Sequence, residues 1–187
     1  MAEILRLCTS NAAKVREFSE MLGRRIEAIE LVLDEPQGLD PIPIAAQKAS
    51  QAFELCRAPV MVDDSGLGLA ALGGFPGALV TWVLTNGGVE LLHRMLPAGA
   101  EETAVATTVI GYADYTGVRT FPGSLRGRIV PHARGEHGFG FDPVFIPEGH
   151  DITLAEMTWE AKNALSPRRR ALEAMLDYLE HPIRVSD

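Results

Sequence analysis

The sequence has few cysteines, few aromatic residues and no long apolar run, and each shortage excludes a class of protein. Among its 187 residues are only two cysteines, Cys8 and Cys56, both within apolar patterns. They indicate buried thiols and argue against a disulfide framework or a cysteine metal site. No apolar run reaches the roughly 18 residues of a membrane span, and the N-terminus lacks the basic start and apolar core of a signal peptide. We therefore expect a cytoplasmic protein without membrane contact.

Positive charge is also scarce. The formal net charge of −8 at pH 7 argues against general nucleic-acid binding, although basic residues that converge locally can still hold a small anion. Hydrophobic residues make up 47% and charged residues 22% of the chain, as in globular domains. The length and the absence of repeats, linkers and low-complexity tracts predict one domain over residues 1–187.

The most informative stretch is an apolar run, Val60 to Val62, that ends in two adjacent carboxylates, Asp63 and Asp64, before Ser65. We predict a short buried strand over 60–62, because the run is apolar, partly β-branched and follows a proline. Open α/β sheets bind ligands at such strand ends. If the strand continued, the two carboxylates would face opposite sides, and one could hold a metal or a water while the other makes a supporting contact. A solvated polar turn is the simpler alternative.

The N-terminal segment is typical of the start of an α/β unit. A predicted strand over 4–8 precedes a helix that should end at Gly23. Three helix-capping residues separate them: Thr9, Ser10 and Asn11. Because helix N-termini have free N–H groups and favour anions, the segment up to Lys14 is a candidate phosphate cradle. It has no glycine-rich fingerprint, so an ordinary capped helix with a solvated lysine is the alternative.

The remaining pattern alternates strands and helices, which predicts an α/β fold. We expect strands over 29–33, 105–113 and 118–121, the last extended by 126–130, and helices over 41–56, 78–84 and 89–96. Ser166 and Pro167 should cap and begin a C-terminal helix. Glu35 lies in an exposed turn rich in helix breakers. Lys48 lies at the edge of an apolar helix face, where lysines usually extend their charge to solvent.

Two further features have open interpretations. Phe139 and Phe141 alternate with glycines in residues 135–147, which suits either stacking on a nucleobase or plugging the core. Three arginines from Arg168 onward stand in the first turn of the last helix, where the helix dipole disfavours positive charge. Either an anionic group compensates them or they form a solvated basic face.

Five motifs in register resemble the inosine triphosphate pyrophosphatase family, also called non-canonical purine nucleoside triphosphate or dITP/XTP pyrophosphatases. The motifs cover residues 9–14, 63–67, 71–77, 138–143, and 155–157 with Lys162, Asn163 and Ser166. The resemblance implies an elongated α/β fold in which a long mixed β-sheet with flanking helices forms two lobes around a central cleft. It also implies a homodimer that hydrolyses ITP, dITP and XTP to the monophosphate and pyrophosphate with Mg²⁺.

The resemblance also assigns site residues by motif position. Glu35 and Asp64 would hold the metal, and Asp64 would lie nearest the attacking water. Lys14 and Lys48 would be the other catalytic groups. The implied substrate-binding residues are Thr9, Ser10, Asn11, Lys14, Lys48, Ser65, Phe139, Gly140, Phe141, Asp142, Lys162 and Arg168.

One position departs from the family pattern. Where the family has a histidine that helps to read the 6-oxo group of the base, this chain has Pro167. The departure leaves the expected phosphate and metal residues intact but changes the expected base pocket. Two alternatives therefore stand beside the leading hypothesis: the same chemistry on another modified nucleotide, or a nucleotide-binding protein without turnover.

Overall fold

The structure, a computed structural model, describes residues 5–181 of the chain. Residue 4, where the first strand was predicted to begin, lies outside the described part. In chain order the elements are β1 (Arg6–Cys8), α1 (Ala12–Leu22), β2 (Glu27–Ile29), α2 (Pro41–Cys56), β3 (Val60–Leu69), η1 (Ala70–Leu72), β4 (Pro76–Gly77), α3 (Val80–Gly87), α4 (Leu91–Arg94), β5 (Thr103–Asp114), β6 (Gly117–Ile129), η2 (Asp142–Val144), β7 (Phe145–Pro147), α5 (Trp159–Leu165) and α6 (Pro167–Glu180).

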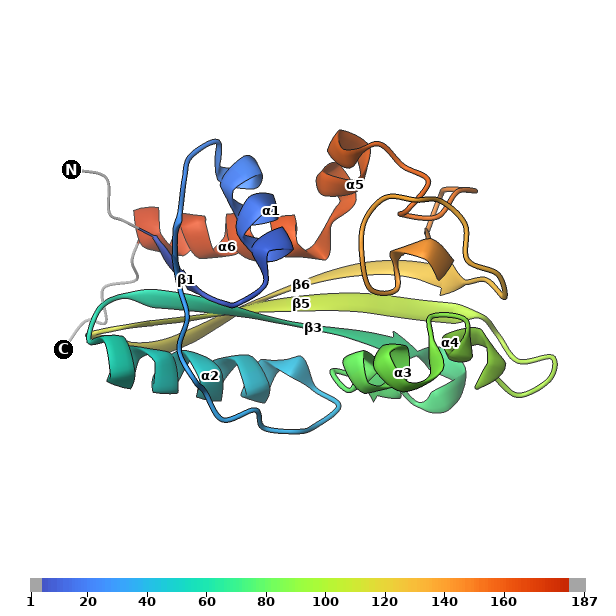
Figure 1. Cartoon of the computed structure of the whole chain (residues 1–187), viewed down its shortest axis with the longest axis horizontal. Helices are drawn as coiled ribbons and strands as arrows, with labels where there is room; N and C mark the ends of the chain where they lie inside the picture. Colours follow the sequence, from blue (N-terminus) through green and yellow to red (C-terminus); the bar gives the residue numbers. More distant parts are fainter. Residues whose placement is uncertain (1–4, 182–187) are drawn as a thin grey trace.

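One mixed sheet of seven strands runs through the molecule, in the order β2-β1-β3-β5-β6-β7, with β4 paired to β3. Strand β1 is parallel to β2 and β3, whereas β3, β5 and β6 form a long antiparallel core. These three strands extend along the long axis of the molecule (Figure 1). The predicted α/β class with a long mixed sheet and flanking helices is confirmed.

Helices cover both faces of the sheet. Helix α2 lies on one face, while α1, α5 and α6 lie on the other, and α3 and α4 pack at the right-hand end in Figure 1. Helix α2 approaches β5 closely because its contact face consists of small residues, including Ala45 and Ala49, both fully buried. Opposite them stands Gly111, where a Cβ would collide with the Ala45 carbonyl oxygen. Small residues on both partners therefore set this separation between helix and sheet.

The central strand is much longer than its apolar run predicts. Strand β3 continues through Asp63 and Asp64 to Leu69, and all ten of its residues pair with β5. The long strand β5 supplies the hydrogen bonds that keep these residues in a strand, although polar residues and glycines have little strand preference of their own. This continuation decides which way the two carboxylates point.

The predicted strand over 29–33 is wrong. Strand β2 ends at Ile29, because its partner β1 offers only three residues for pairing. Beyond it, Leu31 and Leu33 pack against the buried core between α2, β3 and β5, whereas Val32 is 97% exposed. The residues between β2 and α2 form an irregular segment that carries Glu35.

Other boundaries also shifted. Helix α3 begins at Val80 and includes Gly87, α4 is a single turn, and α5 was not predicted. Strand β6 is continuous through Pro122, where it is an edge strand because β7 pairs only with Gly127 to Ile129. The predicted helices over 41–56 and from Pro167 are confirmed, with Asp40 and Ser166 as N-caps.

Two smaller sequence expectations can be checked in the described part. Cys8 is buried and Cys56 half-buried, and both are free thiols; burial raises the pKa of Cys8. Between residues 5 and 181, no helix combines the length and apolar character that crossing a membrane requires.

Candidate active site

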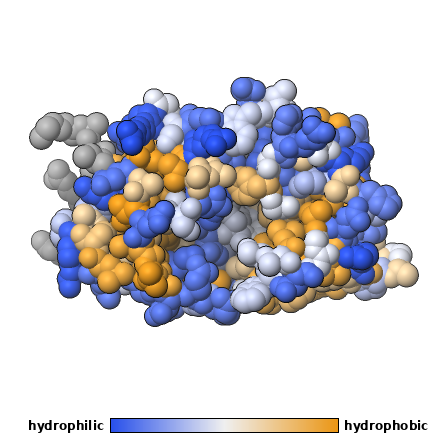
Figure 2. Space-filling model, viewed as in Figure 1, coloured by the Kyte–Doolittle hydropathy of each residue, from blue (hydrophilic) through white to orange (hydrophobic). Residues whose placement is uncertain are grey.

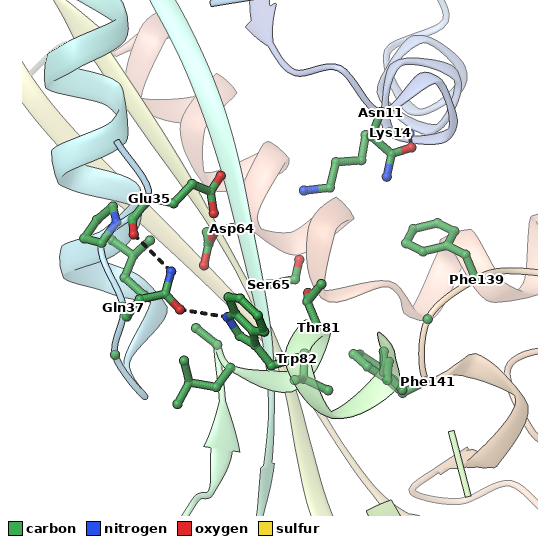
Figure 3. Close-up of a pocket in the computed structure, with 18 of the residues that line it drawn as sticks. Asn11, Lys14, Glu35, Gln37, Asp64, Ser65, Thr81, Trp82, Phe139 and Phe141 are labelled. Carbon is green, nitrogen blue, oxygen red and sulfur yellow. Dashed lines mark hydrogen bonds between the residues drawn. The ribbon is translucent and has the colours of Figure 1, made fainter. Parts of the chain in front are cut away.

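A cleft of about 480 Å³ opens beside the middle of β3. The middle of the molecular face is hollowed in the space-filling view (Figure 2). The residues lining the cleft are Asn11, Lys14, Glu35, Pro36, Gln37, Gly38, Ile44, Asp64, Ser65, Ala78, Leu79, Val80, Thr81, Trp82, Leu84, Phe139, Gly140, Phe141 and Arg168. The structure therefore brings together residues from segments that are far apart in the sequence (Figure 3).

Asp64 faces this cleft from β3, beside Glu35 and Lys48. The Lys48 Nζ lies 3.0 Å from Glu35 Oε1 and 3.3 Å from Asp64 Oδ1. The lysine side chain is only 14% exposed, so it does not extend into solvent as its helix position suggested. Its charge is shared between the two carboxylates, which are thereby aimed at a common point.

Burial and charge act against each other at this group. Burial raises the pKa of Asp64, although the nearby Lys48 and Lys14 charges work in the opposite direction. For Lys48, burial alone would lower the pKa, but Asp64 and Glu35 outweigh it and raise the pKa. The carboxylate of Asp64 is thus held in a partly desolvated site where an additional cation would be stabilising.

The donor set fits Mg²⁺. This ion is usually bound by one or two carboxylates, with phosphate oxygens and waters completing its shell, and Glu35 and Asp64 already converge on one cation, the Lys48 ammonium. Within residues 5–181 no group of three or more His, Cys, Asp or Glu side chains is arranged to hold a metal. A metal held by these two carboxylates would take its remaining ligands from water and from substrate phosphate.

Asp63 points to the opposite face of β3. Its Oδ1 lies 2.9 Å from the Lys14 Nζ, and its Oδ2 accepts hydrogen bonds from Arg168 Nε and Nη2 at 3.0 and 2.9 Å. Burial alone would raise the pKa of Asp63, but the Lys14 and Arg168 charges outweigh it and hold the pKa at about 2. Asp63 therefore stays ionised and anchors two of the predicted substrate-binding side chains.

Sequence reasoning missed Glu17, which belongs to the same buried charge group. Its side chain is 1% exposed and pairs with Arg168 Nη1 through Oε2 and with Lys162 Nζ, 3.2 Å away, through Oε1. A faint signal existed: Glu17 lies one helical turn from Lys14 and beside Phe18, on the buried face of α1. A glutamate at that position needs buried cations as partners.

The buried charges form one continuous network. From Glu17 it continues through Lys162, whose Nζ lies 2.8 Å from Asp142 Oδ2. Burial raises the pKa of Asp142, against the effect of the Lys162 charge. The same Asp142 oxygen accepts a hydrogen bond from the Phe139 N–H at 2.8 Å, which fixes the aromatic loop to the network. Three carboxylates and three cations thus hold α1, β3, α5, α6 and this loop together.

The two phenylalanines of the loop have different positions. Phe139 is 36% exposed, faces the cleft, and has the Lys162 Nζ 4.6 Å from its ring centroid. Phe141 packs against buried residues of the hydrophobic core, with its ring centroid 5.9 Å from that of Phe145. The two alternatives therefore apply to different residues: Phe139 is available for stacking on a base, while Phe141 mainly fills the core, although it also lines the cleft.

A second, smaller cavity of about 70 Å³ adjoins the cleft. Its lining includes Phe139, Asp142, Lys162, Pro167 and Arg168. Arg168 lines both cavities, but its guanidinium is committed to Asp63 and Glu17. For Arg168, these carboxylates are the anionic groups that compensate its unfavourable position in the first turn of α6.

The phosphate-cradle segment forms the predicted capped turn. Asn11 Oδ1 accepts hydrogen bonds from the N–H groups of Ala13 and Lys14 at 2.9 and 3.4 Å, and Thr9 Oγ1 accepts one from the Asn11 N–H at 3.1 Å. Asn11 and Lys14 line the cleft, whereas Thr9 and Ser10 stand outside its lining. Ser65 also lines the cleft, where its hydroxyl lies 3.0 Å from that of Thr108.

A family model described as the Ham1 family matches residues 5–178. The chain belongs to the Ham1 family. The resemblance carried by the sequence motifs is thereby confirmed. Curated proteins similar to this chain also have the names of the family that the motifs predicted.

Two curated relatives illustrate the match. The dITP/XTP pyrophosphatase of Methanopyrus kandleri is 38% identical over 179 residues, which cover 94% of this chain and 95% of the relative. The inosine triphosphate pyrophosphatase of Aspergillus oryzae is 42% identical over 170 residues, which cover 89% of this chain and 88% of the relative.

Solved structures of Ham1 proteins share the fold. The HAM1 protein of Coxiella burnetii matches with a TM-score of 0.81 at 28% identity, over 94% of this chain and 98% of its own. The Ham1 protein of Staphylococcus aureus gives the same TM-score at 25% identity, over 95% of this chain and 98% of its own. Ham1 similarity thus spans sequence and structure over nearly the full chain.

Proposed function

We propose that this Ham1 protein is a Mg²⁺-dependent pyrophosphatase that hydrolyses ITP, dITP and XTP to the nucleoside monophosphate and pyrophosphate. The observation that carries the proposal is that Glu35 and Asp64 line one cleft together with Lys14 and converge on Lys48, which lies behind them. Two carboxylates and two lysines are suited to hold a metal-bound polyphosphate. The printed names of the relatives support the same substrate class.

In this proposal, the chain mainly positions charges. Lys14 and Lys48 bind the triphosphate, and the start of α1 offers further N–H groups. Mg²⁺, held by Glu35 and Asp64, would neutralise phosphate charge and polarise the reacting phosphate. Hydrolysis at the α-phosphorus needs positioning and charge stabilisation more than covalent chemistry from the protein.

Asp64 is the proposed acceptor of the proton from the attacking water. As the water oxygen bonds to the α-phosphorus, the bond to the β-phosphate bridging oxygen breaks, and pyrophosphate leaves. Burial raises the pKa of Asp64, which makes this carboxylate a better proton acceptor than an exposed aspartate. Lys14 and Lys48 stabilise the charge that develops on the leaving pyrophosphate.

The base is assigned to the side of the cleft formed by Phe139, Asp142 and Lys162. The Phe139 ring supplies an exposed stacking face, while Asp142 and Lys162 border the small cavity. Pro167 lines that cavity too and has neither a side-chain donor nor an N–H. This observation favours one second candidate, the same chemistry on a different modified purine nucleotide.

A nucleotide panel with Mg²⁺, scored for released pyrophosphate, tests the proposal. We expect ITP, dITP and XTP to be cleaved faster than ATP and GTP, and a preparation of Asp64→Asn to serve as the control for contaminating enzymes. Binding of ITP without pyrophosphate release would overturn the enzyme assignment in favour of a binding protein. Faster release from another modified purine would select the second candidate. The homodimer implied by the resemblance stays a prediction, to be tested by light scattering.

A further inference from the structure

The two proposed metal carboxylates are held in very different ways. Asp64 belongs to β3, which is paired with β5 along its whole length. Glu35 lies in the irregular segment between β2 and α2, and its side chain is 69% exposed. A metal site needs both carboxylates in place, so the position of Glu35 has to be secured by contacts other than sheet pairing.

Gln37 makes two hydrogen bonds that provide such contacts. Its Nε2 donates to the Glu35 carbonyl oxygen at 3.0 Å, and its Oε1 accepts from the Trp82 indole N–H at 2.8 Å. Figure 3 shows the amide between Glu35 and the indole. A carbonyl only accepts and an indole N–H only donates, so a flipped amide would lose both bonds. The two partners therefore fix the amide in one orientation.

Trp82 connects this amide to helix α3. It belongs to α3, lines the cleft and is 61% exposed, so burial of its large ring does not account for its position. The segment before α3 is also joined to the Glu35 segment, because the Ala78 N–H donates to the Leu39 carbonyl oxygen at 2.9 Å. A Cβ at Gly77 would collide with that same carbonyl.

On the other side, the segment is joined to α2. The Asp34 N–H donates to Gln51 Oε1 at 2.8 Å. The segment that carries Glu35 is therefore bonded to α2 before Glu35 and to α3 and the residues preceding it after Glu35. Gln37 links the backbone of Glu35 to the side chain of Trp82.

We infer that Trp82, acting through the Gln37 amide, is a positioning residue that holds Glu35 where it meets Asp64 for metal binding. The inference rests on the proposed function, because Glu35 is a metal ligand only within it. Loss of one ordinary hydrogen bond corresponds to about a two- to tenfold change in an equilibrium constant. We therefore expect a change of that size in metal affinity.

The test measures the Mn²⁺ concentration that half-saturates the protein, by electron paramagnetic resonance with the metal alone. Trp82→Phe keeps the ring but removes the N–H, and Gln37→Met removes both hydrogen bonds at similar volume. Each should raise half-saturation about two- to tenfold. In the double variant, Trp82→Phe should add nothing to Gln37→Met, because both act through one amide. Additive effects would overturn the inference.

Two further readouts separate positioning from general damage. Hydrogen exchange in residues 31–39 of the metal-free protein should speed up in both variants while exchange in α2 stays unchanged. The Mg²⁺ concentration for half-maximal pyrophosphate release should rise by the same factor as the Mn²⁺ half-saturation. Tyr115→Phe is the matched control, because it removes an exposed aromatic donor whose hydrogen bond to the Arg57 carbonyl, 2.9 Å long, lies outside the cleft. It should leave Mn²⁺ half-saturation unchanged.

Glu35→Gln distinguishes failure of this inference from failure of the proposed function. If Glu35→Gln weakens Mn²⁺ binding but Trp82→Phe and Gln37→Met do not, the metal site stands and the positioning role is overturned. If Glu35→Gln has no effect, or the wild-type protein binds no Mn²⁺, the metal assignment itself is overturned and the inference with it.

Discussion

Asp63 and Asp64 are consecutive residues whose carboxylates lie on opposite faces of β3 and meet different lysines. Asp63 lies 2.9 Å from the Lys14 Nζ, and Asp64 lies 3.3 Å from the Lys48 Nζ. The pleat of a continuous strand imposes this separation. As a result, one carboxylate joins the buried charge network and its neighbour faces the Glu35 side of the cleft.

Asp64→Asn should abolish turnover while nucleotide binding survives. The amide keeps the shape of the side chain but loses the charge that the proposed metal and water require. We expect pyrophosphate release from ITP to fall about 10²- to 10⁴-fold, the usual range for loss of a general base. An equilibrium titration with ITP checks binding. Near-normal turnover would move these roles elsewhere, with Asp63 the first suspect.

Asp63→Asn should instead destabilise the fold. Arg168 is buried and would lose the charge of a partner that accepts two of its hydrogen bonds. Breaking a buried ion pair by removing one partner costs about 3–5 kcal/mol, measurable as a lower free energy of unfolding in urea. Asp64→Asn is the matched comparison and should be near neutral, since burial disfavours its charge. Equal losses in the two variants would contradict this division of roles.

The stability contributed by Asp63 should depend on pH in one direction. Its folded-state pKa of about 2 lies below the ordinary aspartate value of 3.8, so the folded state favours the ionised form. That stabilisation is fully present above about pH 5 and is lost as the pH falls toward 2. The difference in unfolding free energy between wild type and Asp63→Asn should therefore shrink over this window. A constant difference from pH 6 to pH 2 would show that the charge of Asp63 is not involved.

Activity should require Mg²⁺ and depend on Glu35. Excess chelator should reduce pyrophosphate release to background, and added Mg²⁺ should restore it, because two carboxylates and the triphosphate need a shared cation. Glu35→Gln should raise the Mg²⁺ concentration for half-maximal activity by about tenfold, the lower end for loss of a direct or supporting ligand contact. Full activity in excess chelator would remove Glu35 and Asp64 from a metal site.

Pro167→His should sharpen the preference for ITP over ATP. Hypoxanthine presents an acceptor oxygen where adenine presents a donor, and histidine adds a donor at a residue that lines the small cavity. The native N-terminus of α6 offers little in its place, because the Arg168 N–H is already bonded to Ser166 Oγ at 3.2 Å. One hydrogen bond corresponds to roughly a two- to tenfold rise in the kcat/KM ratio. An unchanged or lower ratio would show that Pro167 is neutral or that the pocket suits another base.

Local sequence determined the parts of this protein that depend on local physics. The proline start and alanine face of α2, the Ser166 and Pro167 start of α6, and the capped turn at Asn11 follow from neighbours in the chain. The order of motifs also determined the family, because spacing along the chain is itself a sequence property.

Tertiary structure alone decided how the charges are used. The local sequence does not require β3 to continue through Asp63 and Asp64. Its ten residue pairs with β5 impose this continuation. Glu17 and Arg168 are 151 positions apart, and only the packing of α1 against α6 brings these buried charges into contact. Sequence identifies charged residues, but a desolvated charge is stable only beside the partners that long-range packing supplies.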